Sequence, residues 1–153
     1  MKAKLTWDSA LRFVGVNEKK HETYFDTSLK GGGLDSAASP MEVLLEAAAA
    51  CTAMDIIAIL QKKRRTVTTF SIDLSAERAE QHPKVFTKIA MDIHLVSPDA
   101  TDRELTRAIE LSQANYCSVS IMLARSGCEI SWRAELRTPL DIERATVALG
   151  GIA

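Results

Sequence analysis

Three cysteines, Cys51, Cys117 and Cys128, are the residues of this sequence best suited to chemistry. No two of them have the C-x-x-C spacing, which excludes a thioredoxin-type redox motif and a zinc knuckle. A low and odd count is typical of a reducing compartment, where a functional cysteine pair is more often redox-active than structural. The cysteines therefore point first to thiol redox chemistry, and we expect a cytoplasmic protein.

Two of the cysteines have contrasting expected surroundings. Cys51 lies in the middle of an alanine-rich helical segment, and Asp55 follows one helical turn later. A carboxylate at that spacing disfavours a thiolate. Cys117 lies at or near the start of a predicted helix, where free backbone N–H groups and the helix dipole favour an anion. The residues alone thus predict that Cys117 is the better intrinsic thiolate.

The remaining candidate ligands give no metal site. Cys128 alternates with apolar residues of a predicted strand, so we expect it in the core. His82 stands beside a proline in a turn and His94 lies on the polar side of a strand, and both are expected to be exposed. His21 shares a strand phase with apolar residues and is expected to be packed. We therefore predict neither a metal nor a cofactor.

Length and charge exclude several classes of protein. The 153 residues suffice for one ordinary domain, and 46% apolar with 25% charged residues is typical of a soluble globular protein. Lys and Arg number 19 against 20 Asp and Glu, which argues against a nucleic-acid or membrane-surface partner. The most apolar segment, 43–60, contains two acidic residues, and the N-terminus lacks an apolar export signal, so we expect no membrane association.

A long central helix is the most strongly marked element. Ser39 and Glu42 form a capping box, and Pro40 occupies the first helical position. The predicted helix covers residues 40–64 and is apolar nearly all round, which indicates that protein surrounds it. The glycine run at 31–33 before it lacks a following Gly-Lys-Ser/Thr, so we interpret it as a flexible linker and not as a phosphate-binding loop.

The order of the other elements predicts an α+β fold with antiparallel sheets. Short alternating stretches indicate strands, and two capped segments indicate helices after the long strands. In chain order we expect strands within 1–27, at 70–76 and at 85–95, two helices within 101–125, a strand at 128–136, and a short helix in the tail, 137–153. The strands within 1–27 have no covering helix of their own, and a partner subunit is one way to cover them.

Three segments resemble the landmark segments of the OsmC/Ohr superfamily. They read SPMEVLLEAAAACTAMDI, AERAEQHPKVFTKI and AIELSQANYCSVSIML, and they are most similar to the OsmC-like branch of predicted redox proteins. The resemblance covers about residues 10–136, and we assign 1–136 to an OsmC-like domain. It implies an intertwined homodimer in which two long helices pack at the centre.

The resemblance also implies an activity. In the peroxidase members one cysteine reduces a peroxide or organic hydroperoxide, a second forms a disulfide with it, and a dithiol restores both. Carried over, Cys51 is the peroxidatic and Cys117 the resolving cysteine. Met41 stands where the peroxidase members carry a glutamate, and Arg12 is the only arginine before residue 39, so we expect slow turnover, with Arg12 or Arg78 as the candidate cation. The alternative is a weakly reactive or non-catalytic dimer that binds a small apolar molecule at its interface.

Overall fold

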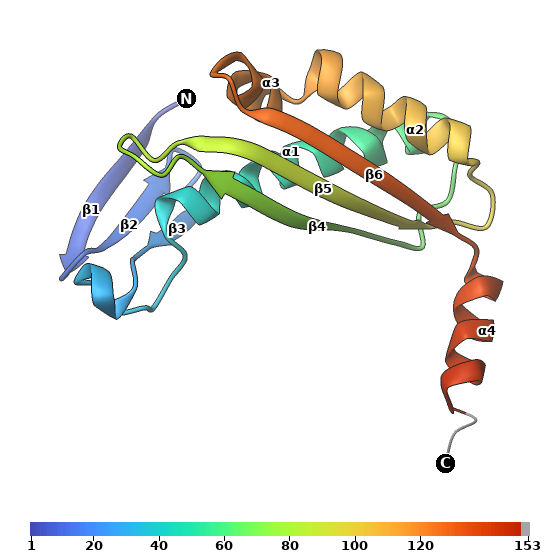
Figure 1. Cartoon of the computed structure of the whole chain (residues 1–153), viewed down its shortest axis with the longest axis horizontal. Coiled ribbons are helices and arrows are strands. Elements are labelled where there is room, and N and C mark those ends of the chain that lie inside the picture. Colours follow the sequence, from blue (N-terminus) through green and yellow to red (C-terminus); the bar gives the residue numbers. More distant parts are fainter. Residues whose placement is uncertain (151–153) are drawn as a thin grey trace. The chain divides into compact units, whose positions relative to one another are not determined.

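The computed structural model describes the backbone of residues 1–150 and the side chains of residues 1–144. The chain forms two compact units, Met1–Glu46 and Ala47–Ala153. Figure 1 labels their helices and strands. Both units combine helix with sheet, and each contains one three-stranded sheet. The predicted α+β class is therefore confirmed.

The first unit is built on an antiparallel sheet in the order β1-β2-β3. Its elements are β1 (Ala3–Ser9), β2 (Arg12–Asn17), β3 (Glu22–Phe25) and a short 3-10 turn, η1 (Leu29–Gly31). Large apolar side chains stay exposed on it, among them Leu5 at 59% and Trp7 at 63%. His21 is exposed just before β3, so its predicted packing is wrong.

A buried carboxylate organises the loop after β3. Asp26 is 1% exposed, and it accepts hydrogen bonds from the backbone N–H groups of Thr27 (2.8 Å), Leu34 (3.2 Å) and Ser36 (3.0 Å). The Ser36 hydroxyl donates a fourth at 2.7 Å. Gly33 is buried beside Asp26, and a Cβ at position 33 would collide with the Thr27 carbonyl. The segment expected to be a flexible linker is therefore held by its own hydrogen bonds.

We expect Asp26→Asn to lower the melting temperature at neutral pH. The hydrogen bonds from Ser36, Thr27 and Leu34 hold the pKa of Asp26 well below its usual range. A depressed pKa stabilises the fold above the unfolded-state value of about 4, and this stabilisation is lost as the pH falls from there toward the folded-state pKa. Melting curves by circular dichroism from neutral pH down to about pH 3 measure this.

The exposed Asp35 supplies the matched control, since Asp35→Asn removes a carboxylate from the same loop. The wild type and Asp35→Asn should lose stability steeply on acidification. Asp26→Asn should start lower and show a shallower decline. An Asp26→Asn protein that melts like the wild type at neutral pH would contradict this role.

The long helix α1 (Pro40–Lys62) begins in the first unit and continues through the second. Its N-terminus has the predicted capping box: the Ser39 N–H donates to the Glu42 carboxylate (2.7 Å), and the Glu42 N–H donates to the Ser39 hydroxyl (3.4 Å). The helix ends two residues before the predicted Arg64, which adopts a positive φ of 59°.

One face of α1 is buried within the chain. The buried positions recur every four residues: Ala48, Thr52, Ile56 and Leu60. Met54, on another face, is 72% exposed. The length and hydropathy of α1 would allow it to cross a membrane, but core helices of soluble proteins can be equally long and apolar. Only 28% of its most apolar stretch is buried within the chain. A single chain therefore does not surround α1 as the sequence predicted.

The second unit contains a sheet in the order β4-β5-β6. Its strands are β4 (Thr69–Arg78), β5 (Phe86–Val96) and β6 (Glu129–Arg137). β4 and β5 are antiparallel, but β5 and β6 are parallel, so the expectation of purely antiparallel sheets is wrong here. The reason is the helical connection from β5 to β6, which carries the chain back to the end of the sheet where β5 began.

That connection consists of α2 (Asp102–Leu111), a turn of π-helix, η2 (Ser112–Tyr116), and α3 (Ser118–Arg125). Thr101 and Glu104 form both halves of the predicted capping box at the start of α2. Gly127, with a φ of 93°, follows the end of α3 as predicted. A last helix, α4 (Pro139–Gly150), follows β6.

The core of the second unit lies between the sheet and these helices. Figure 1 shows α2 and α3 along the sheet. The side chains that are buried on β5, α1 and α2 are apolar: Ile89, Met91, Ile93, Leu95, Ile56, Leu60, Leu105, Ala108 and Ile109. Cys128 is 4% exposed, as predicted. His94 lies on the polar side of β5, between Asp73 and Glu135.

Candidate functional site

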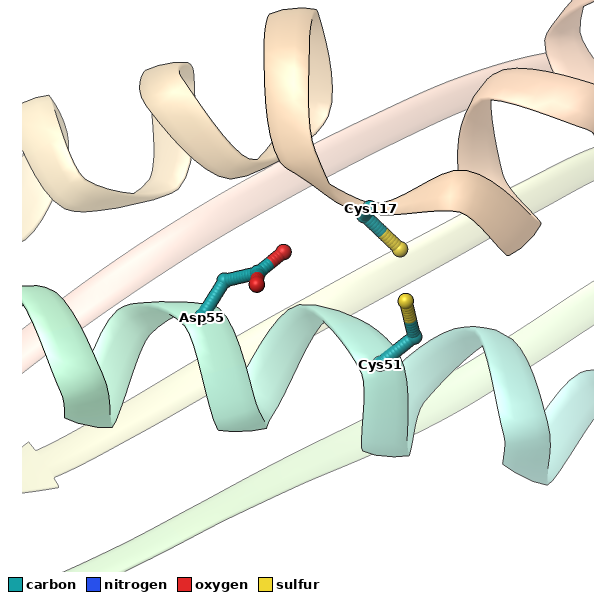
Figure 2. Close-up of side chains that lie close together, drawn as sticks. All are labelled: Cys51, Asp55 and Cys117. Atoms are coloured by element: carbon teal, nitrogen blue, oxygen red, sulfur yellow. The ribbon is translucent and has the colours of Figure 1, made fainter.

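The fold of the second unit brings Cys51 and Cys117 together across 66 positions of sequence. Cys51 comes from α1, and Cys117 directly precedes α3. Their sulfur atoms and a carboxylate oxygen of Asp55 all lie within 4.8 Å of one another. Figure 2 shows the two sulfurs pointing toward each other, with the Asp55 carboxylate to one side. Both cysteines are free thiols, so this is a preformed dithiol.

Cys117 is positioned by the change from π-helix to α-helix. The turn η2 ends at Tyr116, and Cys117 adopts an extended conformation as the N-cap of α3. Its sulfur accepts a hydrogen bond from the Ser120 N–H at 3.4 Å. Single turns of π-helix are rare and often occur at functional sites. The predicted position of Cys117 at a helix N-terminus is confirmed.

A chain of polar side chains surrounds the Cys117 sulfur, which is fully buried. The Thr52 hydroxyl donates to it at 3.3 Å, and the Ser120 hydroxyl lies 3.1 Å away. Gln113 donates to the Thr52 oxygen at 2.9 Å, which leaves the Thr52 proton free for the sulfur. Burial raises the pKa of Cys117, but the hydrogen bonds from Ser120, Thr52 and Cys51 outweigh it and lower the pKa.

Cys51 has the opposite character. Burial raises the pKa of Cys51, and Cys117 and Asp55 raise it further, against one backbone hydrogen bond from Val119. In the described part of the chain, no cation is among the main groups that shift this pKa. Of the two thiols, Cys117 is therefore the more readily deprotonated. This agrees with the prediction that Cys117 is the better intrinsic thiolate.

Asp55 has a fixed orientation beside the thiols. It lies one helical turn after Cys51 and is half-buried. The Ser112 hydroxyl, which is buried in η2, donates to the Asp55 carboxylate at 2.9 Å. The carboxylate thus remains next to the sulfurs and does not turn freely into solvent.

The two arginines that the sequence offered as candidate cations have partners within their own local structure. The Arg12 Nε lies 3.5 Å from the Asp8 carboxylate, with its guanidinium 5.4 Å from the centre of the Tyr24 ring. Arg78 donates to the backbone carbonyl of Lys84 at 2.7 Å. None of these contacts involves a cysteine.

Sequence reasoning missed the polar residues around the thiols. Ser120 carried a usable signal, since it lies three residues after Cys117 at the spacing of an N-cap and its third helical residue. Thr52 and Gln113 carried none, because their partners come from a different helix. Only the packing of α1 against η2 reveals them.

A cavity of about 390 Å³ lies beside Asp55. Its walls combine apolar side chains with two lysines at the end of α1, and the lining residues are Asp55, Ala58, Ile59, Lys62, Lys63, Leu111 and Tyr116. Through Asp55 and Tyr116 the cavity adjoins the dithiol, so it is large enough and close enough to hold part of a small substrate.

Comparisons with known proteins agree with this architecture. The family model for OsmC-like proteins matches residues 32–133. Protein YhfA of Escherichia coli K12 is 37% identical over 126 residues, which cover 82% of this chain and 91% of YhfA. The crystal structure of a hypothetical protein from Aquifex aeolicus is similar with a TM-score of 0.74 and 29% identity, over 89% of this chain and 96% of the other.

Solved structures with lower identity share the fold. One is the crystal structure of an organic hydroperoxide resistance protein from Elizabethkingia anophelis, with a TM-score of 0.63 and 14% identity. The similarity covers 90% of this chain and 97% of that protein. At this level of identity the likeness concerns the arrangement of helices and strands.

Proposed function

Since the chain belongs to the family of OsmC-like proteins, we propose that it is a cysteine-dependent hydroperoxide reductase that cycles between a Cys51–Cys117 dithiol and a disulfide. The observation that carries this proposal is the juxtaposition of the two sulfur atoms in the folded, reduced protein. The shared fold with organic hydroperoxide resistance proteins supports the choice of substrate class.

The cycle begins at the half-buried Cys51. As its sulfur attacks a peroxide oxygen, its proton passes to the Cys117 thiolate. The O–O bond breaks, Cys51 becomes a sulfenic acid, and the leaving alkoxide takes the proton from Cys117 to form an alcohol. The regenerated Cys117 thiolate then attacks the Cys51 sulfur, the S–S bond forms and hydroxide leaves. An external dithiol reduces this disulfide and is itself oxidised to a disulfide.

The test is the consumption of an organic hydroperoxide and of H₂O₂ in the presence of a dithiol reductant. We expect slow but repeated turnover, because the pKa of Cys51 is raised and no cation stabilises its thiolate within the described residues. A rate no higher than that of a variant lacking both cysteines would overturn the proposal.

The cavity beside Asp55 favours a second candidate, a dimer that binds a small apolar molecule. Ala58, Ile59 and Leu111 provide an apolar wall. This function requires no redox turnover. Selective shifts of the Ile59 and Leu111 methyl signals in NMR spectra upon titration with an apolar ligand, in a protein without hydroperoxide turnover, would favour it.

We expect the protein to be a homodimer in the cytoplasm. Leu5, Trp7 and Met54 are each more than half exposed in the single chain, and exposed apolar surface of this kind marks an interface. Light scattering at micromolar concentration should give a mass of about twice 16.7 kDa. A folded species with the mass of one chain would contradict this prediction.

A further inference from the structure

We propose that Cys51, Asp55 and Cys117 form a binding site for a thiophilic divalent cation of the Zn²⁺ type, which reversibly blocks the dithiol. Three ligand atoms of suitable type, two sulfurs and one carboxylate oxygen, already lie within 4.8 Å of one another. Sulfur and carboxylate oxygen are both common zinc ligands. This mixed set contains no histidine and no C-x-x-C pair, so neither of the usual sequence patterns of a zinc site marks it.

The geometry requires only a small contraction. In a tetrahedral zinc site, Zn–S distances of about 2.3 Å and Zn–O distances of about 2.1 Å place neighbouring ligand atoms roughly 3.5–3.8 Å apart. Cys51 and Asp55 are four residues apart on α1 and therefore project from the same face. Cys117 completes the triangle from the N-terminus of α3. All three ligands therefore belong to a helix or to the residue that caps one.

The surroundings of the ligands support metal binding. Ser112 fixes the Asp55 carboxylate, and Thr52 donates to the Cys117 sulfur; such supporting hydrogen bonds orient ligands in metal sites. Cys51 and Asp55 are only half-buried, so a cation and a fourth ligand, such as water, can enter from their side. Over the residues described, Asp55 forms no ion pair with lysine, arginine or histidine.

Binding is a ligand exchange without electron transfer. The cation exchanges bound water molecules for the lone pairs of both sulfurs and of the Asp55 oxygen, and any proton on either sulfur is released to solvent. With both sulfurs coordinated, neither is free to attack a peroxide. Metal binding therefore reversibly inhibits the reaction of the two thiols with peroxides. The binding step itself does not depend on the proposed reductase activity.

The test is titration of the fully reduced protein with Co²⁺, followed by displacement with Zn²⁺. We expect one Co²⁺ per chain, with the near-ultraviolet sulfur-to-cobalt absorption and the intense visible bands of a tetrahedral site. Asp55→Asn should weaken Co²⁺ binding by roughly tenfold or more while both thiols remain. Cys51→Ser and Cys117→Ser should each remove most of the sulfur-to-cobalt absorption.

Two control variants make the result decisive. Cys128→Ser removes the third cysteine, and Asp102→Asn removes an exposed carboxylate from the first turn of α2; both should bind Co²⁺ like the wild type. Unchanged affinity in Asp55→Asn, or loss of the signal in Cys128→Ser, would overturn the site. Since no peroxide is present, failure of the reductase proposal would leave these titrations unaffected, and the reverse also holds.

Discussion

Cys51→Ser is expected to abolish hydroperoxide turnover, with a loss on the order of 10³-fold or more. A serine hydroxyl at position 51 is a far weaker nucleophile than a thiol and forms no sulfenic acid or disulfide. Cys117 then keeps its hydrogen bonds from the Thr52 hydroxyl and the Ser120 N–H but is fully buried. Because a peroxide reaches it poorly, Cys117 should remain largely a thiol. Steady-state peroxide consumption and mass spectrometry of the oxidised variant measure both effects.

Cys117→Ser gives the complementary result in the same experiments. Cys51 should still react once, but its sulfenic acid has no resolving thiol and should persist or become over-oxidised. A sulfenic-acid trapping reagent should label position 51. Cys128→Ser is the matched control, since it removes a buried cysteine outside the site and should retain wild-type turnover. Ready oxidation of Cys117 in the Cys51→Ser protein would show that the two roles are reversed.

Thr52→Val is expected to slow disulfide formation by about tenfold at neutral pH. The Thr52 hydroxyl donates to the Cys117 sulfur at 3.3 Å, and a hydrogen bond to a charged group contributes about 1.5–3 kcal/mol. Its loss should raise the pKa of Cys117, so fewer molecules hold the thiolate that accepts the Cys51 proton and resolves the sulfenic acid.

Thr52→Ser separates this effect from a general loss of packing. Serine keeps the hydroxyl and the acceptor for Gln113, so it should retain most of the wild-type rate. Stopped-flow measurement of disulfide formation after a peroxide pulse, repeated across pH, checks the prediction. A Thr52→Val protein whose rate and pH profile match the wild type would show that this hydroxyl does not tune Cys117.

Many of the helices and strands could be predicted because their signals are local. The capping boxes at Ser39 and Thr101 mark the first residues of α1 and α2, since the same side chains that signal a helix start also form its first hydrogen bonds. Alternation of apolar residues located β4 and β5. The position of Cys117 at a helix N-terminus was predicted for the same reason, because an N-cap depends on neighbours within three residues.

Other features depend on contacts between distant residues. The parallel pairing of β5 and β6 follows from the path of α2 and α3, which periodicity does not encode. The hydrogen bonds of Thr52 with Gln113 and Cys117 connect α1 to a π-helical turn that no sequence pattern marked. Likewise, Asp26 reaches Leu34 and Ser36 only after the loop has closed.

The exposed side of α1 was not predicted from its apolar pattern. The all-round apolar sequence predicted burial on every side, yet the buried stripe from Ala48 to Leu60 occupies one face. Met54 is 72% exposed on another. An apolar sequence predicts that a helix face is shielded from water. It does not predict whether the shielding residues belong to the same chain or to a second one.

Peptide mapping after one equivalent of organic hydroperoxide shows directly whether Cys51 and Cys117 form a disulfide. Each chain should become lighter by two hydrogen atoms and yield one joined peptide that links Cys51 to Cys117, while Cys128 stays reduced. The two sulfurs already face each other, so this link should form much faster in the folded protein than in a denatured control. A folded protein whose Cys51 and Cys117 remain thiols, or oxidise no faster than in the denatured chain, would contradict the proposed cycle.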